Sequence, residues 1–308
     1  MSHAHTSLVK PITPHLWFDK QAREAAGFYC SVFPQSKIDY IAQLRDTPSG
    51  DCDVVSFTLH GQPFMAISAG PLFKFNPSVS FFVHFDPARD PDARANLDRL
   101  WAALVDGGQA LMPLDKYPFS EHYGWVQDRY GVSWQLMLTD PAGEPKPPIV
   151  PSLMFTGDVY GKAGEAGAFY RSVFDDSAAG RLVSYPAGMP ADREGTVMYS
   201  DFRLGEGWFA AMDSGHPHGF GFNEAISFMV TCRDQAEIDR YWAQLSSVPE
   251  SEQCGWCKDR FGLSWQITPR LMDEILASGD QAAINRATQA LLPMHKLNVE
   301  AIAAAAKA

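Results

Sequence analysis

Few side chains in this sequence combine a type and a spacing that would support chemistry. Cys254 and Cys257 have the spacing of a redox pair, and His216 and His218 have the spacing of a weak metal site. The cysteines run into a predicted strand, where a spacing of three points side chains to opposite faces, so we expect structural thiols. The histidines lie in a glycine-rich loop, and we expect no bound metal there.

Two further patterns have a chemical reading and a structural one. Glu121 and His122 could supply a carboxylate and an imidazole for acid–base work, but successive strand residues face opposite ways, so we expect both to be solvated. Asp128-Arg129 and Asp259-Arg260 each precede an aromatic residue and a glycine. This pattern predicts a turn with a local ion pair. We see neither an activated nucleophile nor a coupled pair of carboxylates.

The elements that must position these residues occur twice along the chain. FYCSVF at 28–33 returns as FYRSVF 141 residues later, and GWVQDRYGVSWQL at 124–136 returns as GWCKDRFGLSWQI at 255–267. A period of this size indicates a duplicated domain, and the proline-rich stretch at 140–148 has the composition of a linker. We therefore expect a first domain at 10–140, a second at 149–270 and a helical extension at 271–308.

Each half reads as a strand, a helix and three strands, and then the same order again. This predicts an α+β fold in which each domain has two βαβββ modules forming a curled mixed sheet, with the helices outside. The second half has only 9 residues between Leu245 and Gly255, where the first has 19 between Leu104 and Gly124. One strand or loop is therefore expected to be shorter there.

Composition narrows the class of protein. The chain of 308 residues has a net charge of −11, which disfavours nucleic acid and anionic membranes as partners. Its apolar stretches are far shorter than the ~20 residues of a membrane-spanning helix. Five cysteines cannot all pair within one chain, so free thiols are expected. We predict a soluble cytoplasmic protein without a nucleic-acid or membrane partner.

Three segments carry a family resemblance: AREAAGFYCSVF, ISFMVTCRDQAEIDRYWAQLS and CGWCKDRFGLSWQITPRLMDEIL. They resemble the PhnB-like, demethylubiquinone-methyltransferase-like branch of the vicinal oxygen chelate (glyoxalase and bleomycin-resistance) superfamily, over residues 12–276. The resemblance implies the fold but not one function, because the superfamily includes metal-dependent enzymes and drug-binding proteins. Methyl transfer finds no support, since the first strand is followed by Asp19-Lys20-Gln21 instead of a glycine-rich turn.

The resemblance also implies where a metal would bind. In metal-using relatives His, Gln or Glu ligands project from the first, fifth and last strands of a domain. The matching residues are His15, Ser80 and Gln135 in the first half and Ser152, Ser227 and Gln266 in the second. Serine is a poor ligand and a carboxamide adds no charge, so we expect neither a metal nor another cofactor.

Alternation along the strands defines the inner surface of each domain. The candidate ligand-binding residues are His15, Trp17, Ser80, Phe82, His84, Gln135, Ser152, Ser227 and Gln266. Such a wall suits a small, partly aromatic ligand, so we expect a small-molecule-binding protein that uses no metal. The alternative is a metal-dependent lyase, isomerase or transferase that acts on a small oxygenated substrate, with His15 and His84 as metal ligands. A third hypothesis is a purely structural module.

The alanine-rich C-terminal tail bears on assembly. Leu297, Val299 and Ile302 form a narrow apolar stripe that needs cover from the chain itself or from a second copy. We therefore expect a homodimer, while a monomer with the tail docked on its own chain remains the alternative.

Overall fold

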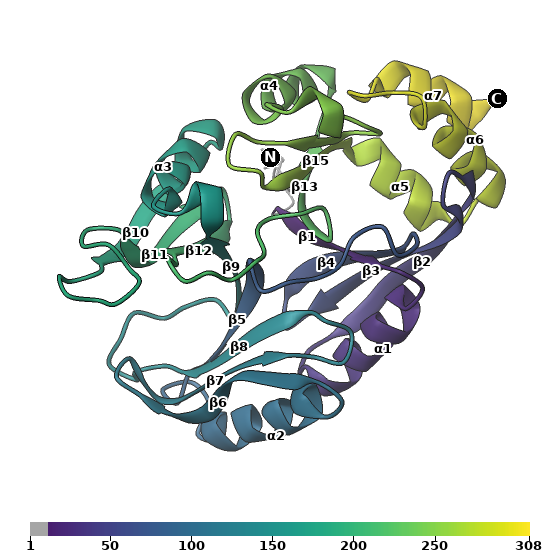
Figure 1. The fold of residues 1–308 in the computed structure, drawn as a ribbon. Coiled ribbons are helices and arrows are strands. Elements are labelled where there is room, and N and C mark those ends of the chain that lie inside the picture. The colour runs from purple at the N-terminus through teal and green to yellow at the C-terminus, as the bar shows by residue number, and fades with distance from the viewer. Residues whose placement is uncertain (1–11) are drawn as a thin grey trace, which may run out of the picture.

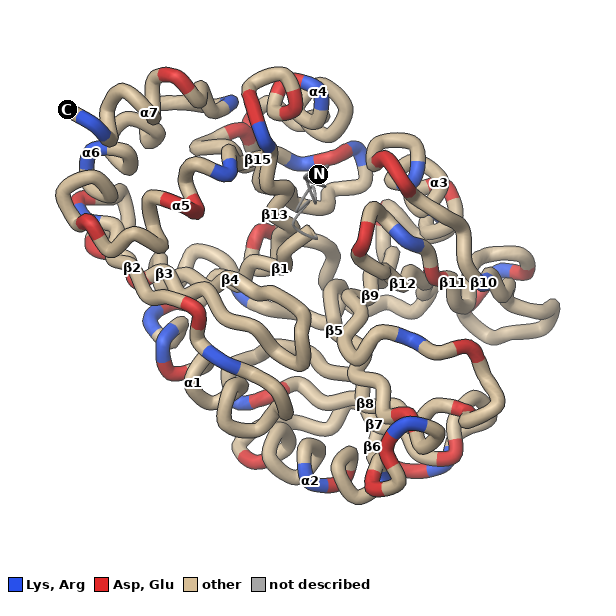
Figure 2. The backbone as a smooth tube through the Cα atoms, turned by 180° about the vertical axis from the view of Figure 1, so that it is seen from behind, with Lys and Arg blue, Asp and Glu red and all other residues tan. Residues whose placement is uncertain are grey.

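A computed structural model describes residues 12–308, which form two mixed β-sheets, each with helices on one face, and a helical extension (Figure 1). The α+β fold of two repeated domains with C-terminal helices is confirmed. Among the described residues no helix is long and apolar enough to cross a membrane. Acidic and basic residues are interspersed over the helices and loops (Figure 2).

The first sheet has seven strands. In spatial order they are β14 (Trp256–Lys258), β15 (Ser264–Pro269), β13 (Ile226–Cys232), β1 (Thr13–Phe18), β4 (Gln62–Ser68), β3 (Gly50–Leu59) and β2 (Lys37–Thr47). Helix α1 (Ala22–Val32) packs on β3 and β4, and α4 (Gln235–Leu245) packs on β13 and β15. We call the opposite face of this sheet its inner face.

The second sheet has eight strands. In spatial order they are β10 (Ala178–Ser184), β11 (Val197–Leu204), β12 (Gly207–Asp213), β9 (Ile149–Phe155), β5 (Val79–Phe85), β8 (Ser133–Leu138), β7 (Ser120–Gln127) and β6 (Gln109–Tyr117). Its helices are α2 (Ala93–Val105) and α3 (Ala163–Val173), and short 3-10 turns lie at Gly157–Val159 and Pro249–Ser251. In the part of the chain that the structure describes, the seven-stranded sheet has no strand equivalent to β6, which shows that the shortening expected before Gly255, of a strand or a loop, removes a strand.

Each sheet takes one module from each half of the chain. Strand β1 of the first half pairs antiparallel with β13 of the second, so His15 lies opposite Ser227. Strand β5 pairs antiparallel with β9, so Ser80 lies opposite Ser152. The two modules of one half therefore lie in different sheets, and the halves are joined by two continuous β-ladders.

The two modules of one half instead meet through their helix-bearing faces. Tyr29 on α1 is fully buried because residues at helical spacing on α1 face the core, and it donates a hydrogen bond to Asp128 Oδ2 at 2.7 Å. Trp134 on β8 donates to the same oxygen at 2.8 Å. In the second half Tyr170 and Trp265 bind Asp259 Oδ2 in the same way.

These buried aspartates correct the expected local ion pairs. Asp128 Oδ1 accepts the backbone N–H groups of Tyr130 and Val132, so the predicted turn is present. Its neighbour Arg129, however, pairs with Asp106 at 2.7 Å. The acid faces the core because the Tyr and Trp donors of its own half need an acceptor there.

The C-terminal extension consists of α5 (Arg270–Ser278), α6 (Gln281–Leu291) and α7 (Val299–Lys307). Helices α5 and α6 cover β2, where Met272 and Ile275 pack in one apolar cluster with Ala42. Past α6, the carbonyl groups of Met294 and His295 accept the backbone N–H groups of Cys254 and Gly255. The extension thus covers both ends of the seven-stranded sheet.

The apolar stripe of the tail is covered by its own chain. Ile302 and Leu297 are buried in the same cluster as Ile284 of α6. The stripe therefore gives no support to a dimer. Homodimerisation stays a prediction that this stripe no longer supports.

Candidate functional site

A compact polar group lies on the inner face of the seven-stranded sheet, across the ladder that joins the two halves. We call His15, Ser227, Ser264 and Gln266 the His15 set. Ser227 lies opposite both His15 and Ser264. The carboxamide Nε2 of Gln266 donates to Ser227 Oγ at 2.9 Å. His15 Nδ1 and Ser264 Oγ are buried and have no hydrogen-bond partner.

Aromatic rings surround His15. Trp256 lies edge-on to it, with ring centroids 5.4 Å apart at 89°. Trp17, two residues along β1, contacts Trp256 at 5.9 Å and Phe73 at 5.1 Å, again at steep angles. The Trp17 indole is held by a hydrogen bond to the Gly70 carbonyl at 2.8 Å. The polar set therefore lies beside an aromatic wall.

Burial keeps His15 neutral, because desolvation lowers its pKa to about 3. The neutral imidazole has one donor and one acceptor nitrogen. Whichever tautomer is present, the unpartnered Nδ1 can make one more hydrogen bond.

This pKa makes the stability of the fold depend on pH through His15. The pKa of this histidine is lower in the folded state than in the unfolded state. The folded state is therefore favoured most when the pH lies above the unfolded-state pKa, and this stability is lost as the pH falls towards the folded-state pKa. From about pH 6.5 down to about 3 we expect a loss of about 1.4 kcal/mol per pH unit. Urea unfolding of the wild type and His15→Phe between pH 4 and 7 should show a steeper decline in the wild type; equal slopes would contradict this.

The eight-stranded sheet carries the matching polar group, which we call the Ser152 set: Ser152, Ser80, Ser133 and Gln135. Gln135 Nε2 donates to Ser80 Oγ at 2.8 Å, as Gln266 does to Ser227. Here, however, Tyr123 Oη donates to Gln135 Oε1 at 2.5 Å. Ser133 Oγ accepts the Trp125 indole N–H at 2.9 Å. Of this set, only the buried Ser152 Oγ lacks a partner.

The two sets differ because one tyrosine is not repeated. Cys254 stands where the first half has Tyr123, and it turns away to contact the Leu292 carbonyl at 3.3 Å. Among the described residues, Gln266 Oε1 then has no donor. The His15 set thus keeps three groups free to bind a ligand, whereas in the Ser152 set only the Ser152 hydroxyl is free.

The structure regroups the residues predicted from sequence. His15, Trp17, Ser227 and Gln266 share the seven-stranded inner face, and Ser80, Phe82, His84, Gln135 and Ser152 share the eight-stranded one. The sequence placed His15 with Ser80 and Gln135, and Ser152 with Ser227 and Gln266. Those groupings are wrong because the strands of one half pair across to the other half.

Neither set fits a divalent metal ion. The three positions at which relatives hold metal are filled by His15, Ser227 and Gln266 in one sheet and by Ser152, Ser80 and Gln135 in the other. Of these six residues only His15 is a strong metal ligand, and the hydroxyls of Ser227 and Ser80 are bonded to the neighbouring carboxamide. Across residues 12–308 no three His, Cys, Asp or Glu side chains come together as a metal site.

The two-histidine alternative also fails on position. His15 and His84 lie on different sheets, and His84 Nδ1 contacts the Pro147 carbonyl at 2.7 Å. Burial lowers the pKa of His84.

Two other patterns resolve as structural. His122, expected to be solvated, is buried, and its Nε2 lies 2.6 Å from Asp98 Oδ1 on α2, while Glu121 is exposed. Of the Cys254–Cys257 pair, Cys257 is buried in the core, and burial raises the pKa of both thiols. Neither therefore has the lowered pKa of a redox thiol.

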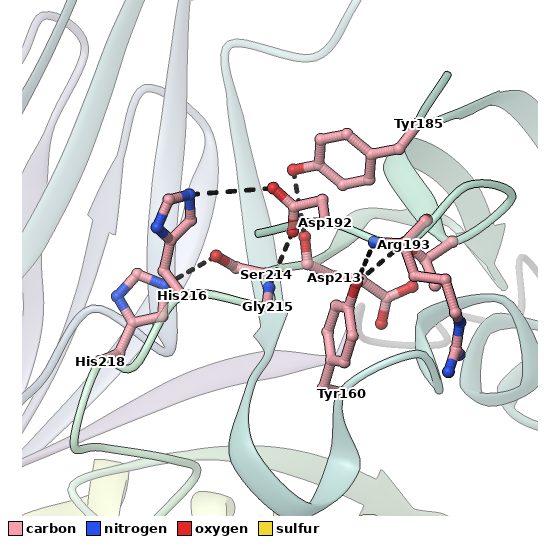
Figure 3. Close-up of polar contacts among 10 residues, drawn as sticks. Tyr160, Tyr185, Asp192, Arg193, Asp213, Ser214, Gly215, His216 and His218 are labelled. Carbon is pink, nitrogen blue, oxygen red and sulfur yellow. Dashed lines mark hydrogen bonds and ion pairs between the residues drawn. The ribbon is translucent and has the colours of Figure 1, made fainter. Parts of the chain in front are cut away.

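The loop with His216 and His218 forms a separate polar cluster (Figure 3). Ser214 Oγ lies 2.7 Å from His218 Nε2, and His216 Nε2 lies 3.9 Å from Asp192 Oδ2. The Gly215 amide, next to Ser214 in the chain, is already bonded to Asp192 Oδ1 at 2.8 Å. Within residues 12–308 no carboxylate is bonded to His218, and the Gly215 amide is occupied, so the cluster does not have the geometry of an activated serine.

Asp213 of the same cluster has a structural role. Asp213 Oδ1 accepts the Gly161 and Ala163 amides at the start of α3, and its Oδ2 accepts the Val197 amide. These bonds tie the end of β12 to α3 and β11.

A cavity of about 880 Å³ opens elsewhere, between the end of α3, α4 and the start of α5. Its charged lining includes Asp175, Glu237, Arg233 and Arg270. It contains none of the predicted site residues, so its size does not identify the site.

Several residues of the inner faces were missed from the sequence. Trp256 lies beside His15, and Phe73 lies beside Trp17. Strand alternation through residues 256–258 would have indicated Trp256, but no pattern marks a loop residue such as Phe73. Lys146 lies in the linker, where an isolated cation gives no signal.

The fold places the chain among two-sheet proteins built from repeated βαβββ modules. Glyoxalase I from Zea mays is similar in fold, with 10% identity, a TM-score of 0.52, and 87% of this chain and 95% of that chain covered. The family model of 3-demethylubiquinone-9 3-methyltransferase matches residues 10–137 and 147–268, and the chain belongs to this family.

Two solved structures are closer in sequence to part of the chain. The PhnB protein from Bacillus cereus is 37% identical over 42% of this chain and 100% of its own, with a TM-score of 0.38. A protein from Staphylococcus aureus is 34% identical over 43% and 98%, with a TM-score of 0.18. None of the curated proteins matches the chain.

Proposed function

We propose that the protein binds a small aromatic molecule on the inner face of the seven-stranded sheet, without a metal. The observation that carries this proposal is the pair of buried, unpartnered polar atoms His15 Nδ1 and Ser264 Oγ. Leaving such groups without a hydrogen bond costs about 1–3 kcal/mol each, so a bound molecule that satisfies them is favoured.

The chemistry of the set narrows the ligand. Its free groups are the Gln266 carboxamide oxygen, which only accepts, and the His15 nitrogen and Ser264 hydroxyl, which are neutral. The neighbouring Trp17, Phe73 and Trp256 favour a flat ring. A neutral aromatic ring with an adjacent O–H or N–H donor matches both features.

Methyl transfer is not part of the proposal. The family carries a methyltransferase description, but the turn after β1 is Asp19-Lys20-Gln21 and offers no glycine-rich loop for adenosylmethionine. Lewis-acid catalysis is likewise left out because the donor sets do not fit a metal.

Binding of phenol, indole and toluene to metal-free protein, followed by tryptophan fluorescence and thermal shift, tests the proposal. We expect phenol and indole to bind more tightly than toluene, which has no donor. His15→Phe and Gln266→Leu keep the volume and remove the hydrogen bond, so each should weaken phenol or indole about tenfold.

Gln135→Leu is the matched control, because Gln135 occupies the same position in the other sheet. It should leave binding unchanged. Equal effects of the two glutamine variants, or binding of toluene as tight as that of phenol, would refute the assignment of the site. Stabilisation that a chelator abolishes would refute the metal-free mode.

A further inference from the structure

The linker between the halves places a cation on the inner face of the eight-stranded sheet. Lys146 Nζ lies 2.8 Å from Asp201 Oδ2, and its side chain is only 21% exposed. The ammonium also lies over the ring of Trp208, 4.9 Å from the centroid. Both an anion and an aromatic face therefore stabilise the ammonium.

Asp201 is built into the sheet as a fixed acceptor. Its side chain is 2% exposed, its Oδ2 also accepts the Tyr199 hydroxyl at 2.9 Å, and its Oδ1 accepts the Arg181 amide at 2.8 Å. A carboxylate so deeply buried needs a cation near it, because an unpaired charge would be costly.

The linker is held in place at two more points. The Pro147 carbonyl contacts His84 Nδ1 at 2.7 Å, and the Pro148 carbonyl accepts the His84 amide at 2.8 Å. Lys146 thus enters the site from a segment that is anchored on β5.

The duplicated fold does not itself require this arrangement. Phe57 pairs with Phe64 as Phe202 pairs with Phe209, so Ser56 and Pro63 stand where the second half has Asp201 and Trp208. The module folds in the first half without the acid and the ring. The acid and the ring are therefore features of the second half that the module does not need in order to fold.

We propose that Asp201, Trp208 and Tyr199 form a binding site for a primary ammonium group, which the protein fills with its own Lys146. The linker acts as a tethered ligand. The effective concentration of the tethered Lys146 ammonium is in the ~mM range or above. An external amine therefore competes only if it binds more tightly than Lys146 or if the linker is displaced. The ligand class is an alkylammonium compound.

Rescue of Lys146→Ala by n-propylammonium, which replaces the atoms removed by the mutation, tests this proposal. We expect the variant to unfold about 5 °C below the wild type. Propylammonium at 50 mM and constant ionic strength should raise that midpoint by about 2–3 °C, through binding at ~10 mM affinity. The wild type should bind it at least tenfold more weakly, because Lys146 occupies the site.

Three variants and one probe make the result specific. Lys162→Ala is the matched control, because Lys162 pairs with Glu165 on the exposed side of the same half; propylammonium should not stabilise it. Lys146→Met fills the space and should not respond either. The double variant Lys146→Ala, Asp201→Asn should lose the response, and uncharged n-propanol should give none.

Equal stabilisation by propanol and propylammonium would overturn the proposal and indicate a plain apolar hole. Equal responses of Lys146→Ala and Lys162→Ala would overturn it too. If the alanine variant does not fold, Lys146→Ser gives the same readout, since it removes the same three carbons and nitrogen beyond Cβ. None of these outcomes depends on ligand binding at the His15 set.

Discussion

Asp259→Ala should lower the free energy of unfolding by about 4 kcal/mol, the largest effect of a single substitution that we expect. The variant removes the acceptor of Tyr170 Oη, Trp265 Nε1 and two backbone N–H groups, all buried. Burial raises the pKa of the Asp259 carboxyl, and the four donors oppose that rise. Circular dichroism should show a fall of about 10 °C in the unfolding midpoint.

Two comparisons separate this role from the loss of any aspartate. Asp128→Ala removes the equivalent acceptor in the first half and should cost a similar amount. Asp106→Ala removes an exposed partner of Arg129 and should cost less than about 0.5 kcal/mol. A loss at Asp259 as small as the loss at Asp106 would contradict the account of the core.

Cutting the linker between Gly143 and Glu144 should leave the two halves bound to each other. They are joined by the β1–β13 and β5–β9 ladders. Loops of the two halves are also hydrogen-bonded to each other: Asn76 Nδ2 donates to the Gly221 carbonyl, and Asn223 Nδ2 donates to the Lys74 carbonyl. Co-expressed halves with a tag on one should therefore purify as a one-to-one complex.

Each half alone should not remain a monomer. Without its partner the first half exposes the edges of β1 and β5, and such unpaired edges associate with other chains. Sedimentation at micromolar concentration should show self-association or loss of material. Two monomeric halves that do not bind each other would show that the cross-half ladders contribute little to stability.

The sequence was sufficient to predict the modules of the fold because each half repeats its strand and helix patterns. The recurrence of FYCSVF and SWQL marks a domain-sized repeat, and the shorter segment before Gly255 indicates that a strand or loop is shortened, which the structure shows to be a strand that is absent from the seven-stranded sheet. The alternation along β1 and β15 also places His15 and Gln266 on an inner face. These features are local, so periodicity reveals them.

The grouping of the site residues could not be predicted in the same way. Whether β1 pairs with β5 of its own half or with β13 of the other depends on contacts distant in sequence, and both pairings satisfy the same alternation. The effect of Cys254 could not be predicted either. Cys254 replaces the tyrosine found at position 123 of the first half, and this replacement leaves Gln266 without a donor, which becomes evident only once the structure places the two positions beside equivalent carboxamides. The contact of Lys146 with Asp201 needs the path of the linker, which composition does not determine.

A crystal structure after soaking with phenol or indole, each without added metal, tests the central claim most directly. The account predicts the ring against Trp17 or Trp256, with its O–H or N–H within hydrogen-bond distance of Gln266 Oε1, His15 Nδ1 or Ser264 Oγ. Probe density confined to the 880 Å³ cavity near α4 or to the inner face of the eight-stranded sheet would contradict it.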